Sequence, residues 1–409
     1  MAWHVRIPWI HNLPPMIKTA LNGVNRLLYL CSLRKEPMEP ESLQRSLSEI
    51  RDWDAFLHKA RAHKLQLRLY SFLKRGGAGS LLAADIWEKI EKEHRWAQAY
   101  TLALEGELRT VLLPAFNQAG IDVLLLKGAA FLETVYQNKP LRFFLDLDLM
   151  IRGKNFSKAR EVLRALGYCA APVYPALDQP HYEFMHPQRN IPVDLHLEPF
   201  EAWSAFSLKA DWLWENAHPA GTNSSRAFLP EPSRLFLFHL FHLVKHAIAG
   251  ENVFGWYADL DECLRYFTRE IDGRFCRDQI HRSSEILKIT ETLASLNAYF
   301  STPFPDEFRS LVDDLKPIPL NKLFAPRSGP AFPSPGSSRR FLFFWSRVSG
   351  WRGRFALLWN WLFPDESYLR SKYSFRNFHE RVTARFKHLV SMGLKGLCLG
   401  LYYLRNIGK

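Results

Sequence analysis

Apolar residues recur at helical spacing over the first part of the chain. From Glu41 to about Gln118 they fall on one face of successive predicted helices, as in the segment WDAFLHKA. A glycine-rich stretch at 76–79 interrupts this run, and a long helix is predicted from about Ile86 to Asn117. Gly120 follows as a stop, since glycine readily adopts the left-handed conformation that ends helices.

Beyond Gly120 the pattern changes to short apolar runs that alternate with amphipathic segments. These predict a buried strand, a helix, a strand, a helix closed by Gly167, an extended segment and a hairpin, over 121–126, 127–137, 141–151, 155–166, 168–174 and 181–198. The hairpin is expected to turn at Pro187 to Asn190. Strands and helices that alternate in this way indicate a mixed sheet.

Helical periodicity returns at Pro232 and continues to about Phe300. We therefore expect an α+β protein whose mixed sheet is flanked by N-terminal and C-terminal helical regions. The expected divisions are an N-terminal helical region (1–100), a sheet-containing core (101–225), a helical domain (226–324), a linker rich in Pro, Gly and Ser (325–338) and a basic, aromatic C-terminal arm (339–409).

The composition excludes several classes of protein. A hydrophobic content of 47% over 409 residues suits a globular protein rather than a disordered chain. The five cysteines form no C-x-x-C pair, which argues against a disulfide scaffold or a structural zinc site. Prolines interrupt the apolar N-terminal residues and no run of about 18 apolar residues occurs, so neither a signal peptide nor a membrane span is expected. We expect a cytoplasmic protein.

The net charge of +13 is concentrated in one segment. From Arg327 onward the chain has 15 Lys and Arg against 3 Asp and Glu, a net charge of +12, so residues 1–326 are almost neutral. Charge gathered in one segment bears on that segment's partner rather than on the fold. Because the first 326 residues offer no basic track for a phosphate backbone, a nucleic-acid partner is not expected.

Two pairs of polar residues follow strand periodicity. Side chains two apart on a strand share a face, so Asp146 and Asp148 point the same way, as do Asp194 and His196. If the two strands are neighbours, Asp194 joins the first pair. Adjacent carboxylates repel one another unless a hard divalent cation lies between them, and three carboxylates suit a two-metal site for nucleotidyl transfer. The alternative is a polar strand edge that faces solvent.

A phosphate could bind where the first predicted strand ends. Lys127 and Gly128 lie between that strand and the following helix, where backbone N–H groups and the positive end of the helix dipole face outward. Gly128 would allow close approach of an anion, Lys127 would add a charge, and Arg142 could grip phosphate oxygens bidentately.

In these motifs the sequence resembles the uncharacterised bacterial nucleotidyltransferases of the DNA polymerase β-like superfamily. The matching stretches are LLLKGAAFLETVY, RFFLDLDLMI with REVLRALGY, VDLHLEPF, LFHLFHLVKH, WYADLDE and LFPDESYL. The resemblance implies a polymerase β-like palm, Mg²⁺ (or Mn²⁺), and a nucleoside triphosphate donor such as ATP. It implies that Asp146, Asp148 and Asp194 are catalytic metal ligands and that Gly128 is the phosphate-loop glycine. The usual Gly-Ser is Gly128-Ala129 here, which removes a hydroxyl that commonly touches phosphate.

A later helical segment carries histidines on one face. His239, His242 and His246 are spaced so that they could bind a transition metal, although packing against a neighbouring sheet is the more common role. A third interpretation is contact with the nucleotide or the acceptor. His196, His239, His242, Lys245, His246 and Asp259 are the candidates for that contact.

The C-terminal arm interleaves bulky apolar residues with arginines, as in RRFLFFWSRVSGWRGRFALLWNWLF. Such helices could lie on an anionic membrane, at its inner face, or could cap the enzyme body with their aromatic residues buried. The function we expect is Mg²⁺-dependent transfer of a nucleoside monophosphate from a triphosphate to an unknown acceptor. The alternative is a non-catalytic nucleotide-binding or scaffold module that docks on a membrane or an assembly through its basic arm.

Overall fold

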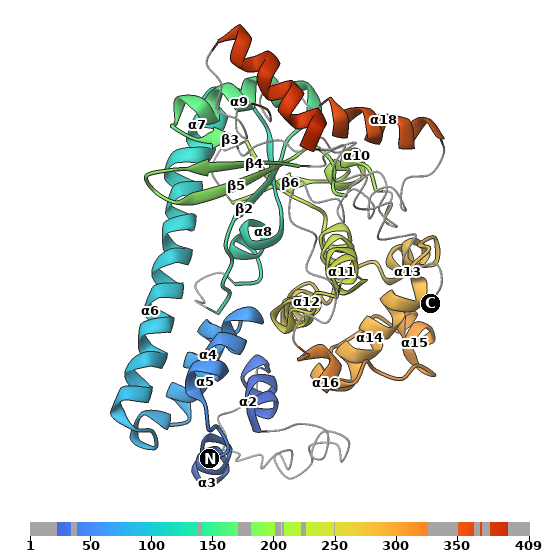
Figure 1. Ribbon diagram of the computed structural model, residues 1–409. Coiled ribbons are helices and arrows are strands. Elements are labelled where there is room, and N and C mark those ends of the chain that lie inside the picture. Colours follow the sequence, from blue (N-terminus) through green and yellow to red (C-terminus); the bar gives the residue numbers. More distant parts are fainter. Residues whose placement is uncertain are drawn as a thin grey trace, which may run out of the picture. The chain divides into compact units, whose positions relative to one another are not determined.

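The protein is described from a computed structural model of the full chain. The structure describes residues 23–33, 39–136, 141–170, 181–200, 206, 208–221, 226–248, 250–325, 351–363, 369 and 377–391. Figure 1 shows helices at both ends of this part of the chain and a sheet formed by its middle. The expected mixed α+β class is confirmed.

The N-terminal helices form where the apolar stripes predict them. They are α2 (Gly23–Ser32), α3 (Pro40–Ser48), α4 (Trp53–Ala62), α5 (Gln66–Arg75) and the short 3₁₀ helix η1 (Ala78–Ser80). The side chain of Asp52 caps α4 by accepting a hydrogen bond from the Ala55 N–H. Phe56, Leu57 and Ala60 form the buried face of this helix. Gly77 adopts a left-handed backbone with φ of 72°, which explains the break after α5.

The long predicted helix is present but interrupted near its end. Helix α6 (Ala84–Glu107) continues into a π-helical turn, η2 (Leu108–Leu112), and then into α7 (Leu113–Gln118). Pro114 has no N–H for the helical ladder, so the wider turn occurs directly before the residue that breaks the ladder. Gly120 follows with φ of 65°, as expected of a stop.

Seven strands form one mixed sheet in the order β3-β4-β5-β2-β1-β7-β6. They are β1 (Val123–Leu125), β2 (Leu147–Met150), β3 (Cys169–Ala170), β4 (His181–His186), β5 (Ile191–His196), β6 (His218–Pro219) and β7 (Ala227–Leu229). β1 pairs with β7 in parallel, whereas β3 with β4, β4 with β5, and β6 with β7 are antiparallel. The predicted hairpin is β4 and β5, which turn at 187–190 with Asn190 in a left-handed conformation.

Helices connect and follow the strands. Helix α8 (Lys127–Glu133) follows β1, helix α9 (Phe156–Ala165) follows β2, and Gly167 closes α9 with φ of 90°. Later in the chain lie α10 (Ala210–Trp214), α11 (Pro232–Ile248), α12 (Phe254–Tyr266), α13 (Gly273–His281), α14 (Ile286–Phe300), α15 (Asp306–Val312) and α16 (Leu320–Leu323). The first of these long helices, α11, is apolar on nearly all sides and is accordingly buried over most of its length.

The described residues fall into two compact units. One contains those up to Leu149 and those from Asp211 to Ala325; the other contains Met150 to Ala210 and the C-terminal helices. The boundary therefore lies within β2. The domain limits expected from the sequence remain a prediction, and residues 326–338 of the expected linker lie outside the described residues.

The C-terminal arm contains two described helices, α18 (Trp351–Leu362) and a second helix over 378–391. Exposed apolar side chains recur at intervals of four residues along both segments: Trp351, Phe355 and Trp359 on α18 with Phe363 directly after it, then Phe378, Val382, Phe386 and Val390. Both interpretations of the arm, contact with a membrane and capping of the enzyme body, remain predictions. None of the helices in the described ranges is long and apolar enough to cross a bilayer.

Candidate metal and phosphate site

The D-x-D segment enters the sheet at β2. Asp148 lies within the strand and is 2% exposed, whereas Asp146 directly precedes the strand and is half-buried. The intervening Leu147 and the following Leu149 are fully buried, which fixes the strand in the core. The carboxylate of Asp148 is therefore held in a place where an uncompensated charge would be costly.

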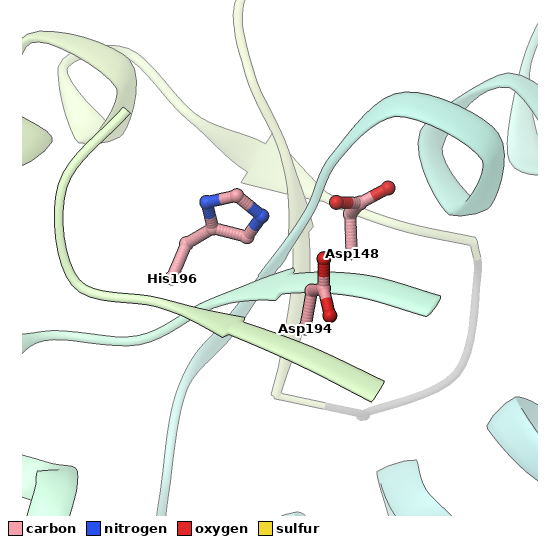
Figure 2. Close-up of side chains that lie close together, drawn as sticks. All are labelled: Asp148, Asp194 and His196. Carbon is pink, nitrogen blue, oxygen red and sulfur yellow. The ribbon is translucent and has the colours of Figure 1, made fainter. Parts of the chain in front are cut away.

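Asp148 lies close to two residues of β5. Its carboxylate, the carboxylate of Asp194 and the imidazole of His196 offer ligand atoms that all lie within 4.8 Å of one another (Figure 2). Strands β2 and β5 are neighbours in the sheet, as the sequence analysis required for Asp194 to approach the D-x-D segment. Within the described part of the chain, Asp146 does not belong to this cluster.

The donor set fits a divalent cation. Two carboxylates and an imidazole are ordinary ligands for divalent metals, and the imidazole suits Mn²⁺ and other transition metals better than Mg²⁺, which prefers oxygen ligands. The geometry thus agrees with a divalent metal without selecting the ion.

His181 also lies at this cluster, and sequence reasoning missed it. Its Nε2 is 4.0 Å from a carboxylate oxygen of Asp194, and its ring centre is 5.0 Å from that of His196. The register of the β4–β5 hairpin pairs His181 with His196 directly. Counting outward from the predicted turn at 187–190 could have found this pairing, since residues opposite each other in a hairpin are fixed by the turn.

Lys127 pairs with Asp148 instead of pointing into an open phosphate loop. Its Nζ lies 2.6 Å from Oδ1 of Asp148, and its backbone has a φ of 44°, a strained value for a residue with a side chain. Gly128 is buried, and a Cβ atom there would lie 2.7 Å from the ring of Phe144. Glycine is thus needed for packing at this position. The phosphate-binding roles of Lys127 and Gly128 remain a prediction.

Arg142 forms a buried ion pair. Its Nη1 lies 2.8 Å from Oδ2 of Asp259, and both side chains are 7% exposed. The hydroxyl of Tyr136 donates to the other oxygen of Asp259 at 2.8 Å, and the guanidinium of Arg68 donates to the Tyr136 hydroxyl at 2.7 Å. Arg142 and Asp259, both candidates from the sequence, therefore form an ion pair with each other. The phosphate contact of Arg142 remains a prediction.

The electrostatics of Asp146 reflect its neighbours. Burial raises the pKa of its carboxyl group, and the nearby charge of Asp148 raises it further. The cations of Lys127, Lys64 and Arg142 oppose this effect and lower the pKa. Lys64 comes from the turn between α4 and α5, and no motif in the sequence pointed to it.

The histidines of α11 contact neighbouring side chains, and their contact with a nucleotide or an acceptor remains a prediction. The ring of His239 stacks on Phe131 with centres 4.0 Å apart, and His242 packs edge-on against Trp256. His246 lies 2.9 Å from a carboxylate oxygen of Glu251. Burial lowers the pKa of all three imidazoles. The three do not form a candidate metal cluster in the described ranges, while Lys245 is half-buried beside them.

Comparison with known proteins gives one match. Neither curated proteins nor solved structures gave a match to the chain. The family model described as "Uncharacterised nucleotidyltransferase" matches residues 49–295, which is more than half of the chain and includes the turn with Lys64, the D-x-D segment, the hairpin and α11 to α12. The chain therefore belongs to this family of uncharacterised nucleotidyltransferases.

Proposed function

We propose that the protein transfers a nucleoside monophosphate from a nucleoside triphosphate to an acceptor, with release of pyrophosphate. The observation that carries this proposal is the cluster of Asp148, Asp194 and His196 in a chain of a nucleotidyltransferase family. It is supported by the acids, which suit a metal cation, and by the cationic side chains near them, which are complementary to the negative charge of a triphosphate. We take the sheet to be a polymerase β-like palm.

The acids have distinct roles in this proposal. Asp148 and Asp194, with His196, would hold a divalent cation, and Asp146 would be drawn in as a ligand of a second cation. Bound metal would supply the charge that activates the attacking oxygen and neutralises the leaving group. Mg²⁺ and Mn²⁺ are both candidates, and the imidazole of His196 favours Mn²⁺.

Lys127 would change partner when substrate binds. A cation at Asp148 competes for the carboxylate oxygen that the Lys127 ammonium contacts at 2.6 Å. The released ammonium would then lie beside a triphosphate and compensate for the hydroxyl that Ala129 lacks. A phosphate oxygen is a strong acceptor for an ammonium group.

Thermal unfolding with each nucleoside triphosphate tests the proposal. A ligand that binds only the folded state raises its stability by mass action, so one triphosphate should raise the melting temperature only when Mg²⁺ or Mn²⁺ is present. Asp148→Asn keeps the shape of the side chain and should abolish the shift. Asp306→Asn, on the exposed surface of α15, is the matched control and should leave it unchanged. Absence of a shift with every triphosphate in the wild type would favour the non-catalytic alternative.

A second candidate function is docking on an anionic lipid surface, favoured by the two exposed apolar rows of the arm. Helix α18 contains two arginines and no acid, and the helix over 378–391 contains three Lys or Arg against Glu380. The exposed fractions of the eight apolar residues run from 46% to 74%. Aromatic residues interleaved with positive charge are typical of helices that lie in a membrane interface, and like charge disfavours pairing with a second copy of the same surface.

Vesicle sedimentation tests the docking function. The double variant Phe378→Ser/Phe386→Ser removes two exposed rings from one row, whereas Thr383→Ser changes an exposed polar residue of the same helix and serves as control. The wild type and the control should bind phosphatidylglycerol vesicles and the double variant should bind them weakly. Equal binding by all three proteins, or binding to phosphatidylcholine alone, would contradict an anionic lipid partner.

A further inference from the structure

Lys64 lies in the turn between α4 and α5 and has an unusual backbone. Its φ is 57°, in the left-handed region that residues with a Cβ atom seldom occupy. A lysine at such a position is surprising, because glycine or asparagine would adopt this turn with less strain. Strained residues with functional side chains cluster at binding sites, so Lys64 is a candidate for a role beyond the turn.

The turn is fixed against the start of α12. The N–H of Gly255 donates to the carbonyl oxygen of His63 at 3.0 Å, and the N–H of Phe254 donates to Nδ1 of His63 at 3.3 Å. A Cβ atom on Gly255 would lie 2.6 Å from the same carbonyl oxygen, so only glycine allows this approach. The backbone of Lys64 is therefore held in place by a helix distant in the sequence.

The ammonium of Lys64 contacts an aromatic ring and lies near the acids of the D-x-D segment. It lies 5.2 Å from the centre of the Trp256 ring, in a cation–π contact. Asp146 and Asp148 are near enough to interact with its charge, as are Lys127 and Arg142. Among the described residues, no ion pair or hydrogen bond of the Lys64 ammonium is found, so its donors are available to a ligand.

The local charges do not balance for a metal alone. Three cations, Lys64, Lys127 and Arg142, lie near Asp146 and Asp148, and Arg142 is also paired with Asp259. A site that bound a bare cation would gain nothing from the two lysines, because like charge would oppose the metal. A ligand that brings several negative charges together with the metal would satisfy all of them.

We propose that Lys64 is a polyphosphate-binding residue, which the N-terminal helical region supplies to the acidic segment. This inference rests on the proposed function and adds to it that the turn after α4 is part of the donor site. Bound polyphosphate takes the ammonium from the face of Trp256 into direct contact with its oxygens. The strained turn and the Gly255 contact keep the lysine positioned for that contact.

The test measures binding of inorganic tripolyphosphate to the full-length protein by calorimetry, with Mn²⁺ present, beside binding of Mn²⁺ alone. Lys64→Asn removes the charge and tolerates the left-handed backbone, while Lys64→Arg keeps the charge. Lys74→Asn removes a lysine from the exposed end of α5 as a matched control. We expect Lys64→Asn to weaken tripolyphosphate binding at least about tenfold, the loss of one charge-assisted contact, and not to weaken Mn²⁺ binding. Lys64→Arg should recover most of the affinity.

The outcomes separate this inference from the proposed function. Tripolyphosphate affinity in Lys64→Asn equal to that of the wild type and of Lys74→Asn would overturn the role of Lys64, even if nucleotides bind. Wild-type protein that binds tripolyphosphate in a Lys64-dependent way but binds no nucleoside triphosphate would support Lys64 and contradict nucleotidyl transfer. No binding of tripolyphosphate by the wild type would overturn both.

Discussion

The ammonium of Lys127 lies 2.6 Å from a carboxylate oxygen of Asp148, within the candidate metal site. A lysine there occupies the position that a cation would approach, so metal and lysine compete for one carboxylate. If a metal binds, this relationship predicts two states of the site, one in which the lysine neutralises the acid and one in which the metal does. It also predicts that replacing Lys127 changes the affinity for a metal and the affinity for phosphate in opposite directions.

Lys127→Met should strengthen the binding of Mn²⁺ alone and weaken the binding of tripolyphosphate with Mn²⁺. Loss of the competing ammonium frees Asp148 for the metal, whereas loss of the charge removes a phosphate contact. Calorimetric titration of both ligands measures the two effects. A variant in which both affinities fall together would show that Lys127 only supports the fold of the site.

Arg142→Ala should destabilise the fold strongly. The guanidinium pairs with Asp259 in a buried place, and removal of one partner leaves an uncompensated charge, which costs about 3 to 5 kcal/mol. Urea denaturation measures this loss. Arg309→Ala breaks an exposed pair with Asp306 on α15 and should change stability little. A small effect of Arg142→Ala would mean that the pair is not fixed in solution.

Gly128→Ala should destabilise the protein by about 1 to 3 kcal/mol, the usual cost of overpacking, because the added methyl group would meet the ring of buried Phe144. Gly106→Ala in α6 is the control, since nothing lies near the added methyl group and alanine favours a helix. Adding Phe144→Leu to Gly128→Ala should recover part of the stability. If the added Phe144→Leu recovers no stability, the destabilisation does not come from contact with the Phe144 ring.

His63 should make the fold sensitive to acid. Burial, and to a lesser extent the charge of Lys59, lowers the pKa of its imidazole to about 4. The unfolded chain binds the proton more readily, so this contribution to stability is complete above the ordinary pKa of about 6.5 and is lost as pH falls from there toward about 4. The full effect is at most about 3 kcal/mol.

His63→Asn tests this dependence. The asparagine oxygen can accept the hydrogen bond that Nδ1 of His63 receives from the N–H of Phe254. Denaturation midpoints measured between pH 7 and pH 4.5 should fall less in the variant than in the wild type. The buried histidines of α11 also contribute in this range, so the difference between the two proteins is the quantity of interest. If the midpoints of the two proteins fall in parallel with pH, His63 is not a source of the acid sensitivity.

Local patterns in the sequence predicted much of the fold. The alternation around Asp194 predicted the strand and its face, and the turn at 187–190 predicted the hairpin, because both depend on neighbours in the chain. The π-helical turn before Pro114 could not be read from apolar spacing, which remains helical across it. The approach of Asp194 to Asp148 depended on the order of strands, which the sequence analysis could state only as a condition.

Partners distant in the sequence could not be predicted. Asp259 was identified as a candidate, but its pairing with Arg142 depends on how α12 packs, and no local pattern encodes that. Lys64 shows no motif at all, since its proximity to Asp146 arises from the approach of a turn to the start of α12. Single-sequence reasoning therefore identified Asp148, Asp194 and His196, which lie together in the structure, and did not identify Lys64.

Label transfer from a nucleoside triphosphate tests the central claim most directly. Each triphosphate, labelled at either the α- or the γ-phosphate, is incubated with the protein, Mn²⁺ or Mg²⁺ and a cell extract as the source of acceptor. Nucleotidyl transfer predicts that α-label moves to an acceptor while γ-label leaves as pyrophosphate, and that Asp148→Asn lowers the transfer by orders of magnitude. Transfer of γ-label, or α-label transfer that persists unchanged in Asp148→Asn, would contradict the account.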